Sequence, residues 1–147
     1  MKLTARIAAI VTLLALPLPA LAQQSIPVTL YKNPQCGCCE NYAVYLRENG
    51  FTVDVKPTND LAEISREAGV PEEFEGCHTA FIDGYVVDGH VPVGTIQKLL
   101  SERPAIAGIT LPGMPMGSPG MNGSKTEPFT VFAVTKDGAA PTVYATE

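Results

Sequence analysis

The chain has 147 residues and a formal net charge of -5, with 10 basic and 15 acidic side chains. Binding to nucleic acid depends on basic side chains that displace counterions from phosphates, so this balance argues against a nucleic-acid partner. The acidic residues are scattered along the sequence, and we attribute them to solubility. The length fits one domain of ordinary size with a single core.

The first 22 residues have the pattern of a secretory signal peptide. The pattern consists of a basic start at Lys2 and Arg6, an apolar stretch over residues 7–18 and a small-x-small cleavage site at residues 20–22. Such an apolar stretch is shorter than the ~20 residues that a membrane-spanning helix needs. We therefore expect an exported chain with no membrane span after cleavage, which forms one domain over residues 23–147.

The expected domain opens with a strand, a cysteine-rich loop and a helix. Residues 26–31 are β-branched and aromatic, which predicts a buried strand that runs into the loop. Apolar side chains then recur at helical spacing over residues 39–48, and Gly50 supplies a stop. A second strand over residues 51–55 and a second helix that ends at Gly69 continue the alternation, which favours a parallel first pair of strands.

A hairpin and a third helix follow. Residues 79–82 and 85–87 flank the Asp83-Gly84 pair, which is a strong signal for a tight hairpin turn. Residues 92–102 then have the apolar face of a helix and are followed by a proline. The order βαβ, α, ββα is typical of a thioredoxin-like domain, so we predict an α/β fold of this type.

The last part of the chain changes character. Proline, glycine, methionine and serine dominate residues 110–128, which predicts a long loop, and loops of this length are usually functional or disordered. Residues 129–134 and 141–144 then predict a closing β-hairpin. The expected protein is thus a thioredoxin-like βαβαββα domain with an added Met/Pro/Gly loop and a C-terminal hairpin.

All four cysteines fall into two short motifs, Cys36-Gly-Cys38-Cys39 and Cys77-His78. In a thioredoxin-like order the first motif lies at the amino end of the first helix, where the helix dipole favours the thiolate. The second motif precedes the third strand and should face the first, which would bring four sulfurs together. Thiolates select Cu(I), zinc or iron-sulfur clusters.

Two other interpretations of the cysteines stay open. Cys36 and Cys39 form a C-x-x-C pair, so Cys36 could be the nucleophile and Cys39 the resolving thiol of a thiol-disulfide oxidoreductase. Cys38 argues against this, because a third thiol would interfere with a two-thiol cycle. Two structural disulfides in an exported domain that docks a partner are the other alternative. The adjacency of Cys38 and Cys39 makes two such bridges geometrically difficult.

The remaining candidate ligands are methionines and histidines. Met114, Met116 and Met121 tilt the choice toward Cu(I), because a thioether is a poor zinc ligand, although methionine also serves as apolar filler. Imidazole suits copper too, which makes His78 and His90 candidates. His90 could equally be a capping or surface residue. An acidic run, Glu72, Glu73 and Glu75, is interpreted as a solvated helix start.

Four segments together resemble the exported CopG-type copper-resistance family, long described only as a domain of unknown function. They are residues 31–39, 76–79, 88–92 and 113–121, and the resemblance runs from about Val28 to Tyr144. It implies a thioredoxin-like domain that holds several Cu(I) ions as a cysteine-bridged cluster in the bacterial periplasm. A copper oxidoreductase activity that cycles Cu(I) and Cu(II), and a periplasmic copper chaperone or efflux partner, belong to the same copper hypothesis. A fainter resemblance of residues 31–36 to glutaredoxin-related arsenate reductases supports the fold.

The resemblance also implies which side chains hold the metal. The cluster ligands would be Cys36, Cys38, Cys39 and Cys77. His78, His90 and the three loop methionines, Met114, Met116 and Met121, would be weaker candidates.

Overall fold

A computed structural model describes residues 25–147, so the predicted signal peptide lies outside the described residues. Within residues 25–147, no helix has the length and apolar character needed to cross a bilayer. The elements are, in order, β1 (Ile26–Lys32), α1 (Gly37–Glu48), β2 (Phe51–Pro57), α2 (Leu61–Glu67), a 3-10 helix (Glu72–Phe74), β3 (His78–Ile82), β4 (Tyr85–Gly89), α3 (Val93–Glu102), β5 (Gly108–Leu111), β6 (Thr130–Val134) and β7 (Thr142–Thr146). The predicted α/β class and the βαβ, α, ββα order are confirmed.

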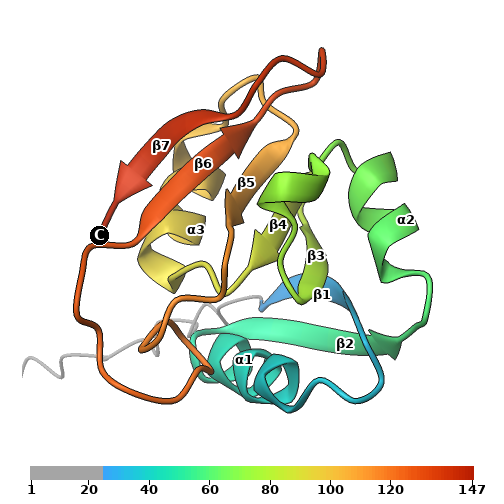
Figure 1. The fold of residues 1–147 in the computed structure, drawn as a ribbon, viewed down its shortest axis with the longest axis vertical. Helices are drawn as coiled ribbons and strands as arrows, with labels where there is room; N and C mark the ends of the chain where they lie inside the picture. Colours follow the sequence, from blue (N-terminus) through green and yellow to red (C-terminus); the bar gives the residue numbers. More distant parts are fainter. Residues whose placement is uncertain (1–24) are drawn as a thin grey trace, which may run out of the picture.

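The strands form one mixed sheet in the order β2-β1-β3-β4-β5-β6-β7 (Figure 1). β1 and β2 are parallel, as the alternation of strand and helix predicts. β3 and β4 form the predicted hairpin, and both turn residues, Asp83 and Gly84, have positive φ angles of 48° and 85°. Such angles are those of the two-residue turn that matches the twist of paired strands.

The prediction of a loop from residue 110 is wrong at its start. Thr110 and Leu111 belong to β5, which pairs in parallel with β4 and antiparallel with β6. The closing hairpin of β6 and β7 is therefore joined to the main sheet through β5. All four β5 residues are buried, and a strand of only four residues is too short for the alternation of Ile109, Thr110 and Leu111 to stand out in the sequence.

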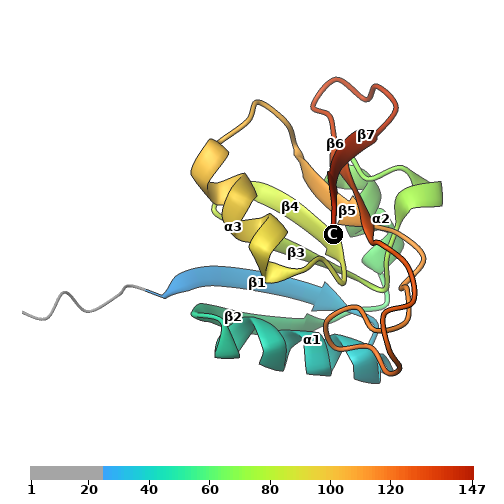
Figure 2. The ribbon, with the colours of Figure 1, turned by 90° about the vertical axis from the view of Figure 1, so that its left-hand side faces the viewer.

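Helices cover both faces of the sheet, as the side chains of β4 show. Val87 packs in the main core, which also contains Tyr42 of α1 and Leu99 of α3. Its neighbour Val86 points to the opposite face and packs with Val70, just after α2. The segment between β5 and β6 leaves the sheet and runs beside the start of α1, as both views of the ribbon show (Figures 1 and 2).

Candidate metal centre

The cysteines meet where β1 ends and α1 begins. Cys36 is the N-cap residue of α1, and Cys38 and Cys39 lie in its first turn because the helix starts two residues earlier than predicted. β3 pairs with β1 so that its first residue, His78, lies opposite Lys32, the last residue of β1. Cys77 precedes His78 and is therefore placed beside the loop that carries the other three cysteines.

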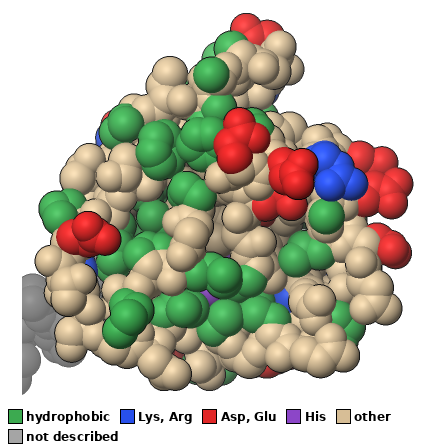
Figure 3. Space-filling model, viewed as in Figure 1, with side chains coloured by type: hydrophobic (Ala, Val, Ile, Leu, Met, Phe, Trp, Pro, Cys, Tyr) green, Lys and Arg blue, Asp and Glu red, His purple; other side chains and the backbone are tan. Residues whose placement is uncertain are grey.

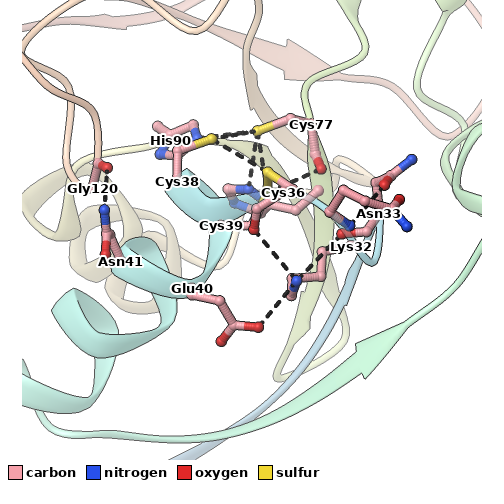
Figure 4. The surroundings of a disulfide bond; sticks show 12 residues. Lys32, Asn33, Cys36, Cys38, Cys39, Glu40, Asn41, Cys77, His90 and Gly120 are labelled. Atoms are coloured by element: carbon pink, nitrogen blue, oxygen red, sulfur yellow. Dashed lines mark hydrogen bonds and ion pairs between the residues drawn. A yellow bond between two sulfur atoms is a disulfide. The ribbon is translucent and has the colours of Figure 1, made fainter.

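The structure brings all four sulfurs together, within 4.8 Å of one another (Figure 4). Cys36 and Cys39 form a disulfide, while Cys38 and Cys77 are free thiols. The Sγ atom of Cys38 lies 3.3 Å from that of Cys36 and 3.7 Å from that of Cys77. The Sγ atom of Cys77 also lies 3.4 Å from that of Cys39. A set of four thiols is therefore available after the disulfide takes up two electrons and two protons.

Cys77 is a half-buried thiol whose pKa lies well above its ordinary value. Burial, followed by the neighbouring Cys38 thiol, raises the pKa of Cys77 to about 12. The free protein thus holds Cys77 as a neutral thiol at neutral pH. A metal ion that binds its sulfur must displace this proton, so metal uptake should release protons.

His90 points one ring nitrogen at Cys77 and the other at the loop between β5 and β6. Its Nδ1 atom lies 2.6 Å from the carbonyl oxygen of Pro119, and its Nε2 atom lies 3.1 Å from the Sγ of Cys77. A carbonyl can only accept, so Nδ1 carries the hydrogen and Nε2 presents its lone pair to Cys77. His90 is fully buried and Pro92 is the N-cap of α3, so the alternative of a surface or capping residue is wrong.

His78 is buried on the other side of Cys77. Its Nδ1 atom lies 3.7 Å from the Cys77 Sγ, and among the described residues its Nε2 atom has no hydrogen-bond partner. The centroid of its ring lies 4.5 Å from the ring centroid of Tyr42 and 4.9 Å from that of His90. Burial, followed by the nearby His90, lowers the pKa of His78 to about 3. Cys77, His78 and His90 thus form a second group that could hold a metal ion.

We expect His78 of the metal-free protein to stay neutral at pH values well below 6.5, the ordinary pKa of histidine. The unfolded imidazole takes up a proton near pH 6.5 and the folded one only near pH 3, so its contribution to stability is complete above pH 6.5 and is lost as the pH falls toward 3. NMR titration of the imidazole resonances measures this directly. An ordinary midpoint for His78 in the folded state would contradict the expectation.

Lys32 organises the cysteine loop, although nothing in the sequence marks it as a site residue. It is the last residue of β1 and, like Val28 and Leu30, occupies one of the buried alternate positions of the strand. Its Nζ atom lies against the backbone of the cysteine loop. Nζ lies 3.3, 3.4 and 3.3 Å from the carbonyl oxygens of Asn33, Pro34 and Cys36. It also forms an ion pair of 3.0 Å with Glu40 in the first turn of α1 (Figure 4). One ammonium group thus fixes the path of the chain into the cysteine motif.

Asp88 of β4 plays a similar part for Cys77 and was also missed from the sequence. Its buried carboxylate accepts hydrogen bonds from the Thr79 hydroxyl at 2.7 Å and from the backbone N–H of Gly76. Gly76 directly precedes Cys77, so this bond holds the second cysteine motif in place. Burial raises the pKa of Asp88 to about 6.

The predicted methionine ligands divide into two groups. Met116 and Met121 line an open cavity of about 540 Å³ together with Cys38. The other lining residues are Gly37, Asn41, Gly120 and Asn122. Met114 is exposed and is not among the residues that line this cavity. The structure therefore places two of the three methionines at the cavity that Cys38 lines.

The fold and the site together define an α/β protein with a cysteine cluster suited to a soft metal ion. A family described as "Protein of unknown function, DUF411" matches residues 74–121, which include Cys77 and both histidines. Two solved structures, titled "Copper resistance protein copG- Form 2" and "Copper resistance protein copG- Form 1", are 36% identical to this chain, with TM-scores of 0.77 and 0.76. Each comparison covers 84% of this chain and 98% of the other. A comparison with curated proteins gives no match.

Identity and coverage of this extent establish kinship rather than a shared fold alone. The chain belongs to the CopG copper-resistance family.

Proposed function

We propose that this protein is exported to the periplasm and protects the cell from excess copper by holding Cu(I) in a cluster bridged by Cys36, Cys38, Cys39 and Cys77. The observation that carries the proposal is the convergence of four cysteine sulfurs within 4.8 Å at the start of α1. The titles of the related structures, which name copper resistance, support the choice of metal.

The ligand set favours Cu(I) over harder ions. Thiolates are soft ligands, and Met116 and Met121, which carry thioethers, line a cavity together with Cys38. One thiolate can bridge two Cu(I) ions, so four clustered thiolates can serve more than one ion. His78 and His90 add neutral imidazole nitrogens beside Cys77. We include both histidines among the proposed ligands.

The Cys36–Cys39 pair can also exchange electrons with copper. When Cys36 and Cys39 are both thiols, they can reduce two Cu(II) ions to two Cu(I) ions. Two electrons pass from the sulfurs to the metal, two protons leave for solvent, and the sulfur–sulfur bond forms. A dithiol reductant would then restore the thiols by exchange and become a disulfide itself. A periplasmic copper chaperone or efflux component would exchange the metal.

The test is retention of Cu(I) by the fully reduced protein. We expect the reduced chain, loaded anaerobically and desalted against a moderate chelator, to keep its copper. The disulfide-bonded chain, treated in parallel, should keep less because two of the four thiolates are absent. Loss of all copper from the reduced protein, with free thiols verified by titration, would refute the proposal.

The Cys36–Cys39 disulfide favours a second candidate function, that of a thiol-disulfide oxidoreductase. Its two cysteines have the C-x-x-C spacing, and the free thiol of Cys77 lies 3.4 Å from the Cys39 sulfur. This function predicts turnover of a disulfide substrate without metal. It also predicts that Cys38→Ser leaves the turnover largely intact, whereas the copper proposal predicts that the same change lowers the number of bound ions.

A further inference from the structure

The cavity beside Cys38 is open to solvent, while the cysteine cluster is half-buried at three cysteines and fully buried at the fourth. Met116, with 64% of its surface exposed, stands at this cavity, and Cys39 is fully buried. We propose that the cavity is a separate loading site, in which Cys38, Met116 and Met121 hold one incoming Cu(I) ion before it reaches the cluster. The proposal rests on the proposed function and adds to it the route by which the metal arrives.

Cys38 is the residue that connects the two sites. Of the four cysteines, it alone lines the cavity, and its sulfur also lies 3.3 Å from that of Cys36 and 3.7 Å from that of Cys77. An ion held by Cys38 therefore needs to exchange only its other ligands to enter the cluster. The two thioether bonds break, bonds to the inner sulfurs form, and the copper stays Cu(I). The proton of each thiol that becomes a ligand leaves for solvent.

The chemistry of the lining fits a soft ion and disfavours a hard one. Two thioethers and one thiol line the cavity, and none of its lining residues carries a carboxylate or an imidazole. Thioethers bind Cu(I) well and zinc poorly. On the face shown in Figure 3, hydrophobic side chains gather in the lower middle among backbone and other atoms, and most of the large acidic side chains lie toward the top and right, with one at the left.

Hydrogen bonds hold the loop that carries the methionines against α1. The Asn41 side-chain amide donates to the Gly120 carbonyl at 3.4 Å (Figure 4). Ser118 is buried, and its hydroxyl donates to the Pro115 carbonyl at 2.7 Å. The backbone N–H of Met121 donates to the Ser118 carbonyl at 2.9 Å. These bonds hold the backbone of residues 115–121 in place beside α1, and Met116 and Met121 line the cavity together with Cys38.

The loading site does not depend on the redox state of the cluster. Cys38 is a free thiol in the structure although Cys36 and Cys39 are joined, and neither methionine takes part in that bond. The disulfide-bonded protein should therefore bind a single Cu(I) ion at the cavity. The four-sulfur cluster should load only after reduction.

The test uses the disulfide-bonded protein labelled with ¹³C at the methionine methyl groups. The chain has four methionines, and their resonances can be assigned by Met→Leu substitution. We expect one equivalent of Cu(I), added anaerobically, to shift the methyl resonances of Met116 and Met121 and to leave that of Met114 in place. Unmoved resonances of Met116 and Met121, with Cu(I) bound, would overturn the proposal.

Affinity measurements on variants supply the second readout. The double variant Met116→Leu/Met121→Leu should bind Cu(I) in the disulfide form at least about tenfold more weakly than the matched control Met114→Leu. Equal affinity in the two variants would show that Cys38 binds without the thioethers, and the loading site would be rejected.

The reduced proteins separate this proposal from the function on which it rests. The reduced double variant should reach the same final copper content as the Met114→Leu control, but more slowly in stopped-flow loading. Equal loading rates would refute the loading site and leave the cluster intact. A reduced wild-type protein that binds no Cu(I) would refute the cluster itself, whatever the methionine resonances show.

Discussion

Replacement of Cys77 with serine is expected to have the largest effect on copper binding by the reduced protein. Cys77 contacts the sulfurs of Cys38 and Cys39 and also the Nε2 atom of His90. It is thus the residue common to both groups of potential ligands. A serine hydroxyl is a hard ligand and does not replace a bridging thiolate. We expect the variant to hold at most half as many Cu(I) ions as the wild type in a competition against a chromogenic chelator.

Cys38→Ser is the matched comparison. The Cys38 thiol contacts the sulfurs of Cys36 and Cys77, but unlike the Cys77 thiol it forms no hydrogen bond with a histidine of the described residues. Both changes are nearly isosteric, so their thermal unfolding should stay close to that of the wild type. The account predicts a loss of copper in both variants and the larger loss in Cys77→Ser. Undiminished copper content in Cys77→Ser would show that Cys77 is not a ligand.

The second large effect is expected from Gly120→Ala, in the loop that carries the methionines. Gly120 has a φ angle of 80° and lies so close to α1 that a Cβ atom there would stand 2.7 Å from the Tyr42 backbone nitrogen and 3.0 Å from the Cys38 carbonyl oxygen. The loop must move away from the helix to accommodate a methyl group. We expect a loss of about 2–4 kcal/mol in the free energy of unfolding, from overpacking and from the left-handed backbone together.

The same substitution should also disturb the site, because the Pro119 carbonyl that orients His90 directly precedes Gly120. Gly113→Ala is the control, since Gly113 has a φ angle of 76° and a Cβ atom there would meet nothing within 4 Å beyond its own chain neighbours. It should lose only about 1 kcal/mol, the cost of the backbone conformation alone. Denaturant unfolding measures both values. Equal losses in the two variants would mean that the close approach of Gly120 to α1 does not stabilise the protein.

The order of elements around the site could be predicted because each signal is local. Three such signals depend only on neighbours in sequence. They are the helical spacing of apolar residues in α1, the Asp83-Gly84 turn, and the β-branched and aromatic residues of β1. β5 escaped prediction because it is a four-residue strand, buried throughout, that joins directly onto a segment rich in proline and glycine. Its pairing with β4 and β6 is determined by tertiary contacts, and four residues are too few for a period-two pattern to be recognised.

The site residues likewise fall into those that could be predicted from sequence and those that depend on tertiary contacts. The convergence of the four cysteines follows from the order βαβ, α, ββα, because β3 returns antiparallel to β1 and carries Cys77 to the loop. Lys32 and Asp88 could not be identified, since their partners lie on other elements and become visible only in the folded chain. The separation of Met114 from Met116 and Met121 depends on the path of an irregular loop, which has no signature in sequence.

The central claim is that the four cysteines form one Cu(I) cluster, and anaerobic titration of the fully reduced chain with Cu(I) tests it most directly. The account predicts more than one tightly bound copper per chain and release of protons as the buried thiols become ligands. A reduced protein with four free thiols and no tightly bound copper would contradict it, and the thiol-disulfide oxidoreductase would then be the better account of the site.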